Sequence, residues 1–333
     1  MNTLRRARRK CGALGAAPRA SLAYASACLG LSLGLGLRPN GRSVRARVVD
    51  APRRQRRTGW RNHEAAPPPL AIAGSMKAKE LMTKDVLAVD KDDRLQTVID
   101  VMLKHRVSKL VVLDKKEVVG VITDGDIADE LGAIKNRGVP ATHLHASSAM
   151  RRKFPTITAD TPLDQILTAL TDDAGILPVL HDKTPIGVVT ASDVLSLVTS
   201  TKPLADVMTN HLHVVSPSDR VIHARRLMID HHVERLPVLD GGRLVGIVGE
   251  IDIANGFSRL KATVADHHQP AALTRFLVQD VMQQTVITAT PETTAREAVE
   301  MMRKEDVGSL PVVRGDRIVG IVTRSDLLKL IRA

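Results

Sequence analysis

Residues 76–333 contain no cysteine, tryptophan or tyrosine. The two cysteines, Cys11 and Cys28, lie upstream, as do Tyr24 and Trp60. A body without cysteine can hold neither a thiol nucleophile nor a thiolate metal site, and it needs no oxidising compartment. Its only aromatic residues are three phenylalanines, so its cores must consist of Val, Ile, Leu, Met and Ala. A bound base would therefore lie between aliphatic side chains.

The formal charge is distributed very unevenly along the 333 residues. Residues 1–75 contain 15 Lys and Arg but only two acids, Asp50 and Glu64, a net charge of +13. Residues 76–333 contain 33 basic and 34 acidic side chains, a net charge of −1. The high isoelectric point thus belongs to the N-terminal segment, and the net charge of the body gives no support for nucleic-acid binding. At 333 residues the chain is longer than a domain with a single hydrophobic core usually is, so its length predicts two domains.

The N-terminal segment, residues 1–75, has three interpretations. Five of its first ten residues are basic, an Ala/Leu/Gly-rich run follows at 21–37, and the rest is rich in Arg and Pro. The run is a poor membrane span but resembles the apolar part of a signal peptide, and the composition also suits an organelle transit peptide. The third interpretation, which we favour, is that Met76 is the true initiator, because a clean repeat begins there. In each case we expect the segment to be disordered, since it has few large apolar side chains to bury.

A seven-residue pattern recurs in the body: glycine, two β-branched residues, threonine and, three positions after the threonine, aspartate. The copies lie at 120–126, 187–193, 246–252 and 320–326, with Gly249 in place of threonine in the third. The apolar run before and within each copy predicts a buried strand, and Thr-x-x-Asp predicts the start of a helix. The sequence therefore predicts four turns from a strand into a helix.

Each of these glycines follows a methionine at a nearly constant distance. The offsets from Met82, Met150, Met208 and Met282 are 38, 37, 38 and 38 residues. A fixed internal period with variable spacers is typical of a repeated structural unit. Successive glycines are 67, 59 and 74 residues apart, so the spacers run long, short, long. We therefore expect repeat 1 to pair with repeat 2, and repeat 3 with repeat 4.

Within each repeat the patterns predict the order β-α-β-β-α. In repeat 1 we expect a helical turn at 78–82, a strand at 86–89, a helix beginning at Asp90, strands at 109–113 and 118–122, and a helix after Asp124. The apolar positions of the first long helix follow the 3.6-residue spacing of one face. In the later repeats Thr161-Pro162, Ser216-Pro217 and Thr290-Pro291 are predicted to open the middle helices, because proline suits the first helical position.

The leading Met, a Leu-Pro-Val strand and the closing Gly-x-x-Thr-x-x-Asp together resemble the features of CBS domains, named after cystathionine β-synthase. The Leu-Pro-Val strands begin at Leu177, Leu236 and Leu310, whereas repeat 1 has Val111 in the place of proline. The resemblance covers essentially all of residues 76–333. It implies an α/β (α+β) fold of four repeats that pair into two Bateman modules, each with two clefts between its sheets.

The expected modules are 76–200, with repeats at 76–133 and 143–200, and 201–333, with repeats at 201–258 and 275–333. The resemblance also implies that such clefts commonly bind AMP, ADP, ATP or S-adenosylmethionine as regulatory ligands.

The closing motif has a chemistry that suits a nucleoside. An aspartate at a helix start can accept hydrogen bonds from both ribose hydroxyls, threonine can add a contact, and the helix N-terminus favours phosphate. The same residues can act only as helix caps, worth about 1 kcal/mol each, and spacing alone does not separate the two interpretations. The family pattern favours ribose contact in at least one cleft. The candidate residues are Thr123, Asp126, Thr190, Asp193, Asp252, Thr323 and Asp326.

Three basic residues are candidate phosphate partners. Lys109 and Arg235 occupy equivalent places in repeats 1 and 3, and Arg324 lies inside the fourth closing motif. A solvated surface position is the commoner fate of such side chains. The histidine pairs at 231–232 and 267–268 predict no metal site, because adjacent residues point in different directions and no carboxylate or cysteine stands at ligand spacing.

We therefore expect a non-enzymatic protein, with no required cofactor, that senses an adenosine nucleotide and regulates an unidentified partner protein. Once four repeats are assigned, no nucleophile–base pair or phosphate-cradling glycine loop remains. One alternative is an accessory subunit of an enzyme or transporter, related to the CBS parts of inosine monophosphate dehydrogenase. The other is a nucleic-acid binder acting through the basic segment, which we consider the less favoured. We expect no membrane span. We expect a cytoplasmic location, or an organelle if residues 1–75 are a transit peptide. A homodimer that forms through the Bateman modules is a further possibility.

Overall fold

The computed structural model describes residues 47–48, 76–133, 139–172, 175–265 and 268–331, all within one compact unit, Val44–Ala333. The predicted disorder of residues 1–75 and the interpretations of that segment concern residues outside those described, with one exception. Strand β1 (Arg47–Val48) pairs antiparallel with the first strand of repeat 1.

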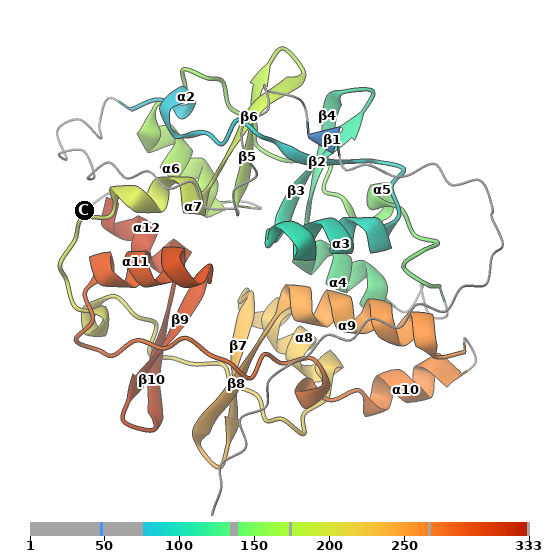
Figure 1. The fold of residues 1–333 in the computed structure, drawn as a ribbon, viewed down its shortest axis with the longest axis vertical. Helices are drawn as coiled ribbons and strands as arrows, with labels where there is room; N and C mark the ends of the chain where they lie inside the picture. The colour runs from blue at the N-terminus through green and yellow to red at the C-terminus, as the bar shows by residue number, and fades with distance from the viewer. Residues whose placement is uncertain (1–46, 49–75, 134–138, 173–174, 266–267, 332–333) are drawn as a thin grey trace, which may run out of the picture. The chain divides into compact units, whose positions relative to one another are not determined.

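The described elements follow the four predicted repeats in chain order (Figure 1). Repeat 1 contains α2 (Ala78–Leu81), β2 (Leu87–Asp90), α3 (Leu95–His105), β3 (Lys109–Asp114), β4 (Glu117–Thr123) and α4 (Asp124–Gly132). Repeat 2 contains α5 (Ala146–Ala149), α6 (Leu163–Asp172), β5 (Ile176–His181), β6 (Thr184–Thr190), α7 (Ala191–Val194) and the 3₁₀ turn η2 (Leu195–Leu197). Repeat 3 contains η3 (Leu204–Asp206), α8 (Val221–His231), β7 (Arg235–Asp240), β8 (Arg243–Gly249) and α9 (Glu250–Thr263). After α10 (Gln269–Arg275), repeat 4 contains η5 (Val278–Asp280), α11 (Ala295–Glu305), β9 (Ser309–Arg314), β10 (Arg317–Thr323), α12 (Arg324–Leu328) and η6 (Lys329–Ile331).

The opening strand is complete only in repeat 1, where β2 pairs parallel with β3 over three residues. In the other repeats it is reduced to single parallel bridges, Ile157 to Val179, Val215 to Val238 and Ala289 to Val312. The partner strand carries a proline beside each of these bridges, and proline has no backbone N–H to donate to a ladder. Repeat 1 has Val111 at that position, and Val111 is paired with Ala88.

Three middle helices begin later than predicted. Helix α6 starts at Leu163, one residue after the predicted start at Pro162, but α3, α8 and α11 begin at Leu95, Val221 and Ala295. The predicted start residues form a preceding turn instead: the Ser216 N–H, for example, donates to Asp219 Oδ2 at 2.7 Å. Asp219, three positions later, thus caps a turn at this point, and α8 begins only after it.

The leading segments are exchanged between paired repeats. Met82 of repeat 1 lies against Gly187 of repeat 2, and Met150 of repeat 2 lies against Gly120 of repeat 1. Met208 and Gly320, and Met282 and Gly246, repeat this exchange in the second half. A Cβ atom at Gly120 would stand 2.9 Å from the Met150 sulfur, so only glycine permits the contact. The exchange brings repeat 1 into contact with repeat 2, and repeat 3 into contact with repeat 4.

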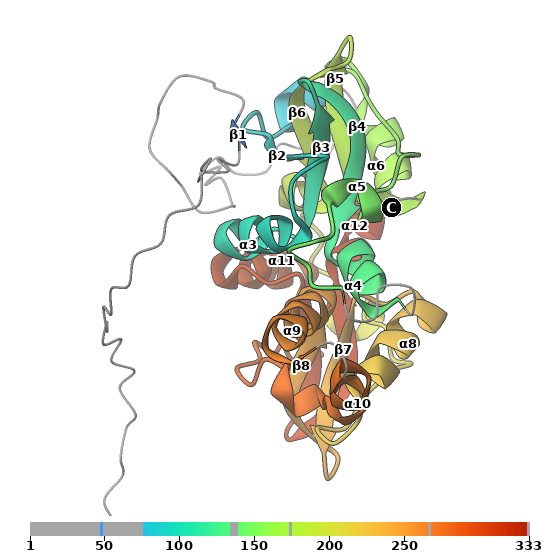
Figure 2. The same cartoon turned by 90° about the vertical axis from the view of Figure 1, so that its right-hand side faces the viewer.

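Helices then join repeats of different modules. Helix α4 packs on α9, which joins repeats 1 and 3, and α7 packs on α12, which joins repeats 2 and 4 (Figure 1). One apolar core, including Ile127 and Phe257, spans repeats 1 and 3, and another, including Leu195 and Leu327, spans repeats 2 and 4. A third cluster lies between the sheets of repeats 1 and 2, whose strands β3 to β6 lie side by side (Figure 2).

Candidate functional site

Each closing motif places an aspartate at the third residue of a helix, where one carboxylate oxygen caps the helix start. Asp126 Oδ2 accepts from the N–H and hydroxyl of Thr123 at 2.9 and 2.8 Å. The same two bonds recur in repeats 2 and 4, at 2.7 and 2.8 Å and at 3.0 and 2.8 Å, formed by Thr190 with Asp193 and by Thr323 with Asp326. In repeat 3, Asp252 Oδ2 accepts from the Gly249 N–H at 2.8 Å and no hydroxyl exists at that position. The caps therefore use Oδ2 and leave Oδ1 for other contacts.

In three of the four motifs, Oδ1 faces the exchanged leading segment of the paired repeat. The donor is the residue directly after the leading methionine: Thr83 Oγ1 to Asp193 at 2.7 Å, Arg151 Nε to Asp126 at 2.8 Å, and Gln283 Nε2 to Asp252 at 2.9 Å. In repeat 4, Lys329 Nζ donates to Asp326 Oδ1 at 3.0 Å from the same helix turn. Thr83, Arg151 and Gln283, each directly after a leading methionine, thus belong to the candidate site. Sequence reasoning missed these residues, although their constant place behind the methionine is a signal that could have identified them.

The aspartates of repeats 2 and 3 lie in partly desolvated surroundings. Burial raises the pKa of Asp193, against the hydrogen bonds from Thr83 and Thr190 that lower it. Burial likewise raises the pKa of Asp252, against the bond from Gln283. A buried carboxylate gains from every added donor, so hydroxyl groups of a ligand would be favourable partners there.

Asp252 also borders a hollow of about 420 Å³ beside α9. Asn255, Arg259, Phe276 and Asp280 form part of its lining. Of the four candidate carboxylates, the one that lacks a threonine partner therefore has space beside it.

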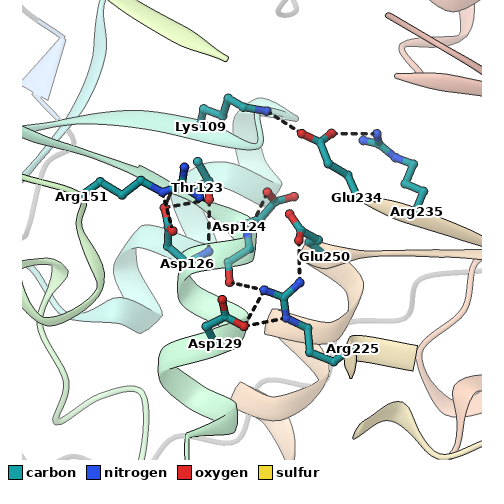
Figure 3. Close-up of polar contacts among 11 residues, drawn as sticks. Lys109, Thr123, Asp124, Asp126, Asp129, Arg151, Arg225, Glu234, Arg235 and Glu250 are labelled. Carbon is teal, nitrogen blue, oxygen red and sulfur yellow. Dashed lines mark hydrogen bonds and ion pairs between the residues drawn. The ribbon is translucent and has the colours of Figure 1, made fainter. Parts of the chain in front are cut away.

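The three predicted phosphate partners act on one acid, Glu234, that sequence reasoning missed. Figure 3 shows two of them, Lys109 and Arg235, beside it. Lys109 Nζ lies 3.2 Å from Glu234 Oε1, and Arg235 Nη1 lies 3.5 Å from Glu234 Oε2. The charge of Lys109, followed by that of Arg235, lowers the pKa of Glu234 to about 2. Arg324 acts on Glu234 in the same direction and donates from Nη2 to the Val307 carbonyl at 3.4 Å. Burial, together with the nearby charge of Arg235, lowers the pKa of Arg324 to about 10.

A second set of charges lies between α4 and α9, close to the first (Figure 3). Arg225, only 8% exposed, donates to Asp129 Oδ1, to Glu250 Oε1 at 2.6 Å and to the Gly125 carbonyl at 3.2 Å. Burial raises the pKa of Glu250 to about 7, with Asp124 raising it further and Arg225 opposing both. Burial also raises the pKa of Asp124 to about 6. The centre of repeats 1 and 3 therefore combines cations with two acids whose pKa values are raised by burial.

Among residues 47–48 and 76–331, leaving out the short undescribed gaps, no group of three His, Cys, Asp or Glu side chains is placed to hold a metal ion. Within the same described part of the chain, no helix has the length and apolar character needed to cross a membrane.

Comparison with known proteins gives a family and several relatives. The model of the CBS domain family matches residues 78–133, 146–200, 204–259 and 278–333, which is more than half of the chain. The chain is 28% identical over 264 residues to protein MJ1404 of Methanocaldococcus jannaschii, covering 76% of this chain and 61% of MJ1404. It is 27% identical over 274 residues to MJ1225 of the same organism, covering 75% of this chain and 97% of MJ1225.

The crystal structure of MJ1225 matches the fold, with a TM-score of 0.66 and 26% identity over 76% of this chain and 99% of that one. Inosine-5'-monophosphate dehydrogenase of Korarchaeum cryptofilum is 36% identical over 128 residues, which are 37% of this chain and only 22% of the enzyme. These relatives share repeats with this chain, and the match to the dehydrogenase leaves most of that enzyme uncovered.

Proposed function

The chain belongs to the CBS domain family, and we propose that it is a non-enzymatic regulatory protein that binds adenosine ligands in the clefts between paired repeats. The ligands in question are AMP, ADP, ATP or S-adenosylmethionine, and their occupancy would be read by a partner protein. The observation that carries this proposal is the arrangement of the four closing aspartates. In three of them one carboxylate oxygen caps a helix and the other faces a polar side chain from the exchanged leading segment.

This arrangement suits the ribose of a nucleoside for two reasons. The helix cap fixes the carboxylate, so little freedom is lost when a ligand hydroxyl donates to it. The Oδ1 donors are side chains such as Thr83 and Gln283, which can rotate away from Asp193 and Asp252 when a ribose arrives. Phosphate groups would extend toward Lys109, Arg235 and Arg324, the cations gathered around Glu234.

A role as the regulatory part of a larger assembly is the second candidate. The match to a segment of inosine-5'-monophosphate dehydrogenase favours it, because similar repeats occur there beside a catalytic region. The nucleic-acid alternative depends on residues 1–75 alone. It predicts that the chain from Met1 binds DNA or RNA and that a variant beginning at Met76 does not.

Isothermal titration calorimetry of aspartate variants tests the ribose assignment. We expect Asp126→Ala, Asp193→Ala and Asp326→Ala each to lower nucleotide affinity or stoichiometry, since a hydrogen bond to a charged group contributes about 1.5–3 kcal/mol. Asp252→Ala should have the smallest effect, because Gly249 already deprives that cleft of a hydroxyl.

Glu297→Ala is the matched control for these variants. Glu297 caps α11 in the same way, accepting from the N–H and hydroxyl of Thr294 at 2.8 and 2.9 Å, but it lies outside the closing motifs. Its loss should lower stability slightly, like the loss of any exposed cap, and leave nucleotide binding unchanged. If all four aspartate variants bind nucleotide like the parent, these residues are caps only and the ribose assignment is wrong.

A further inference from the structure

Glu234 differs from its equivalents in the other three repeats. Glu234 lies two positions before the Leu of its Leu-Pro-Val strand. The equivalent residue is Ser108 in repeat 1, where the strand reads Leu-Val-Val, Gly175 in repeat 2 and Gly308 in repeat 4. Repeat 3 alone has a charged side chain there. Two of the candidate phosphate partners pack on the equivalent glycines. The Lys109 side chain lies against Gly175, and the Arg235 guanidinium lies against Gly308. The position is therefore part of the surface that the candidate phosphate partners share.

The Glu234 carboxylate contacts cations of both modules at once. Its Oε1 lies 3.2 Å from Lys109 Nζ of repeat 1, and its Oε2 lies 3.5 Å from Arg235 Nη1 of its own repeat. The two cation side chains are 18% and 28% exposed, whereas the Glu234 side chain is 57% exposed. The two cation side chains are thus mostly buried, and the Glu234 carboxylate lies on their solvent-exposed side. A ligand anion that contacts these cations would occupy the same place.

We propose that Glu234 is a built-in anion that occupies the cations of the phosphate region, so that the clefts favour adenosine ligands without phosphate groups over nucleoside triphosphates. This inference rests on the proposed function and specifies its ligand class. S-adenosylmethionine, whose sulfonium is positively charged, belongs to the favoured class, and ATP belongs to the disfavoured one.

Glu234 need not form a strong ion pair with Lys109 or Arg235 to have this effect. An exposed pair contributes little by itself, and phosphate could replace the carboxylate beside Lys109 and Arg235. The displaced carboxylate would remain nearby, however, and Asp124 and Glu250 add acidic groups to the same region. Two like charges several ångströms apart repel each other even in a well-hydrated site. The penalty grows with the number of phosphate charges and is absent for a neutral nucleoside.

The test is calorimetric titration of the full chain with adenosine, AMP and ATP, without divalent cations, for the parent and for Glu234→Gln. The variant should bind ATP about tenfold more tightly than the parent does, AMP about threefold more tightly, and adenosine equally. The glutamine of Glu234→Gln could retain a contact with the cations. Glu234→Ser, which introduces the residue found in repeat 1, avoids this and should give the same ranking of affinity gains for ATP, AMP and adenosine. The gain should shrink at high salt.

Glu117→Gln is the matched control, because Glu117 also pairs with a lysine of another repeat, Lys183, at 3.5 Å. It lies at the turn end of the β3–β4 hairpin, whereas Lys109 lies at the opposite end, so its loss should alter no affinity. Equal gains for adenosine and ATP, or no gain for either, would overturn the role of Glu234 while leaving the proposed function intact. Failure of the parent to bind any of these three ligands, and S-adenosylmethionine as well, would overturn both.

Discussion

The two helix interfaces that join the modules use the same part of the repeat in different ways. Between repeats 1 and 3, α4 and α9 have nine and 14 residues and begin with Asp124 and Glu250. Between repeats 2 and 4, α7 and α12 have four and five residues and begin with Ala191 and Arg324. The first interface encloses acids around a buried arginine, and the second is formed by side chains such as Leu195 and Leu327.

The arginine shows what this difference means. Arg225 occupies a helix position at which the other repeats have aliphatic residues, all of them buried: Ile99, Leu167 and Val299. An aliphatic side chain therefore suffices for the fold at this position. Replacing a complete buried ionic group by apolar residues is often neutral or stabilising, whereas removing one member leaves uncompensated charge. The ionic group of repeats 1 and 3 consequently makes that interface sensitive to the loss of one of its charges.

The largest expected effect comes from removing this arginine. Arg225→Met should lower the free energy of unfolding by about 3–5 kcal/mol, because Asp129 and Glu250 would lose their shared cation. Urea denaturation of the full chain measures it. Arg226→Met is the matched control: its side chain is 73% exposed and pairs only with Asp230 on the helix surface, so it should change stability by at most about 1 kcal/mol. Similar losses of stability for both variants would contradict the claim that the buried ionic group makes the interface of repeats 1 and 3 sensitive to charge.

A smaller effect is expected from pH. Burial raises the pKa of Glu250 to about 7 and that of Asp124 to about 6, so the folded state binds more protons than the unfolded state above about pH 4.5. The free energy of unfolding should therefore fall as pH rises from about 4.5 to about 7, by about 1–3 kcal/mol. Ala191 and Arg324, which hold these positions in repeats 2 and 4, do not titrate in this window.

Denaturation at pH 5 and pH 7.5 measures this slope, and the double variant Asp124→Asn, Glu250→Gln should flatten it. An unchanged slope in the double variant would assign the pH dependence to other carboxyl groups, such as Asp193 and Asp252.

Much of the fold follows from local patterns in the sequence. The four closing motifs predict four helix starts, and α4, α7 and α12 begin directly after their threonines. Proline at Pro178, Pro237 and Pro311 marks strands β5, β7 and β9. These signals act over a few residues, so one chain segment is enough to detect them. The start of α3 was placed too early because Asp90 has the chemistry of a helix cap but uses its backbone in a turn with Asp93.

The parts of the site that depend on distant contacts could not be predicted. The constant spacing from Met82 to Gly120 suggests one unit, yet Met82 lies against Gly187 of the next repeat. Arg225 and Arg226 are adjacent and look alike in sequence, and only packing of α8 near α4 makes one of them buried. Glu234 was missed for the same reason, because its partner Lys109 comes from another module.

Thermal unfolding of the full chain with AMP, ADP, ATP and S-adenosylmethionine tests the central claim of adenosine-ligand binding most directly, when each sample is also assayed for ligand turnover. A ligand that binds only the folded state stabilises it by about 2.7 kcal/mol at a hundred times its Kd. We predict that at least one of these ligands raises the midpoint in a concentration-dependent manner and is recovered unchanged. Melting curves that do not respond to any of the four, or conversion of a ligand, would contradict the account.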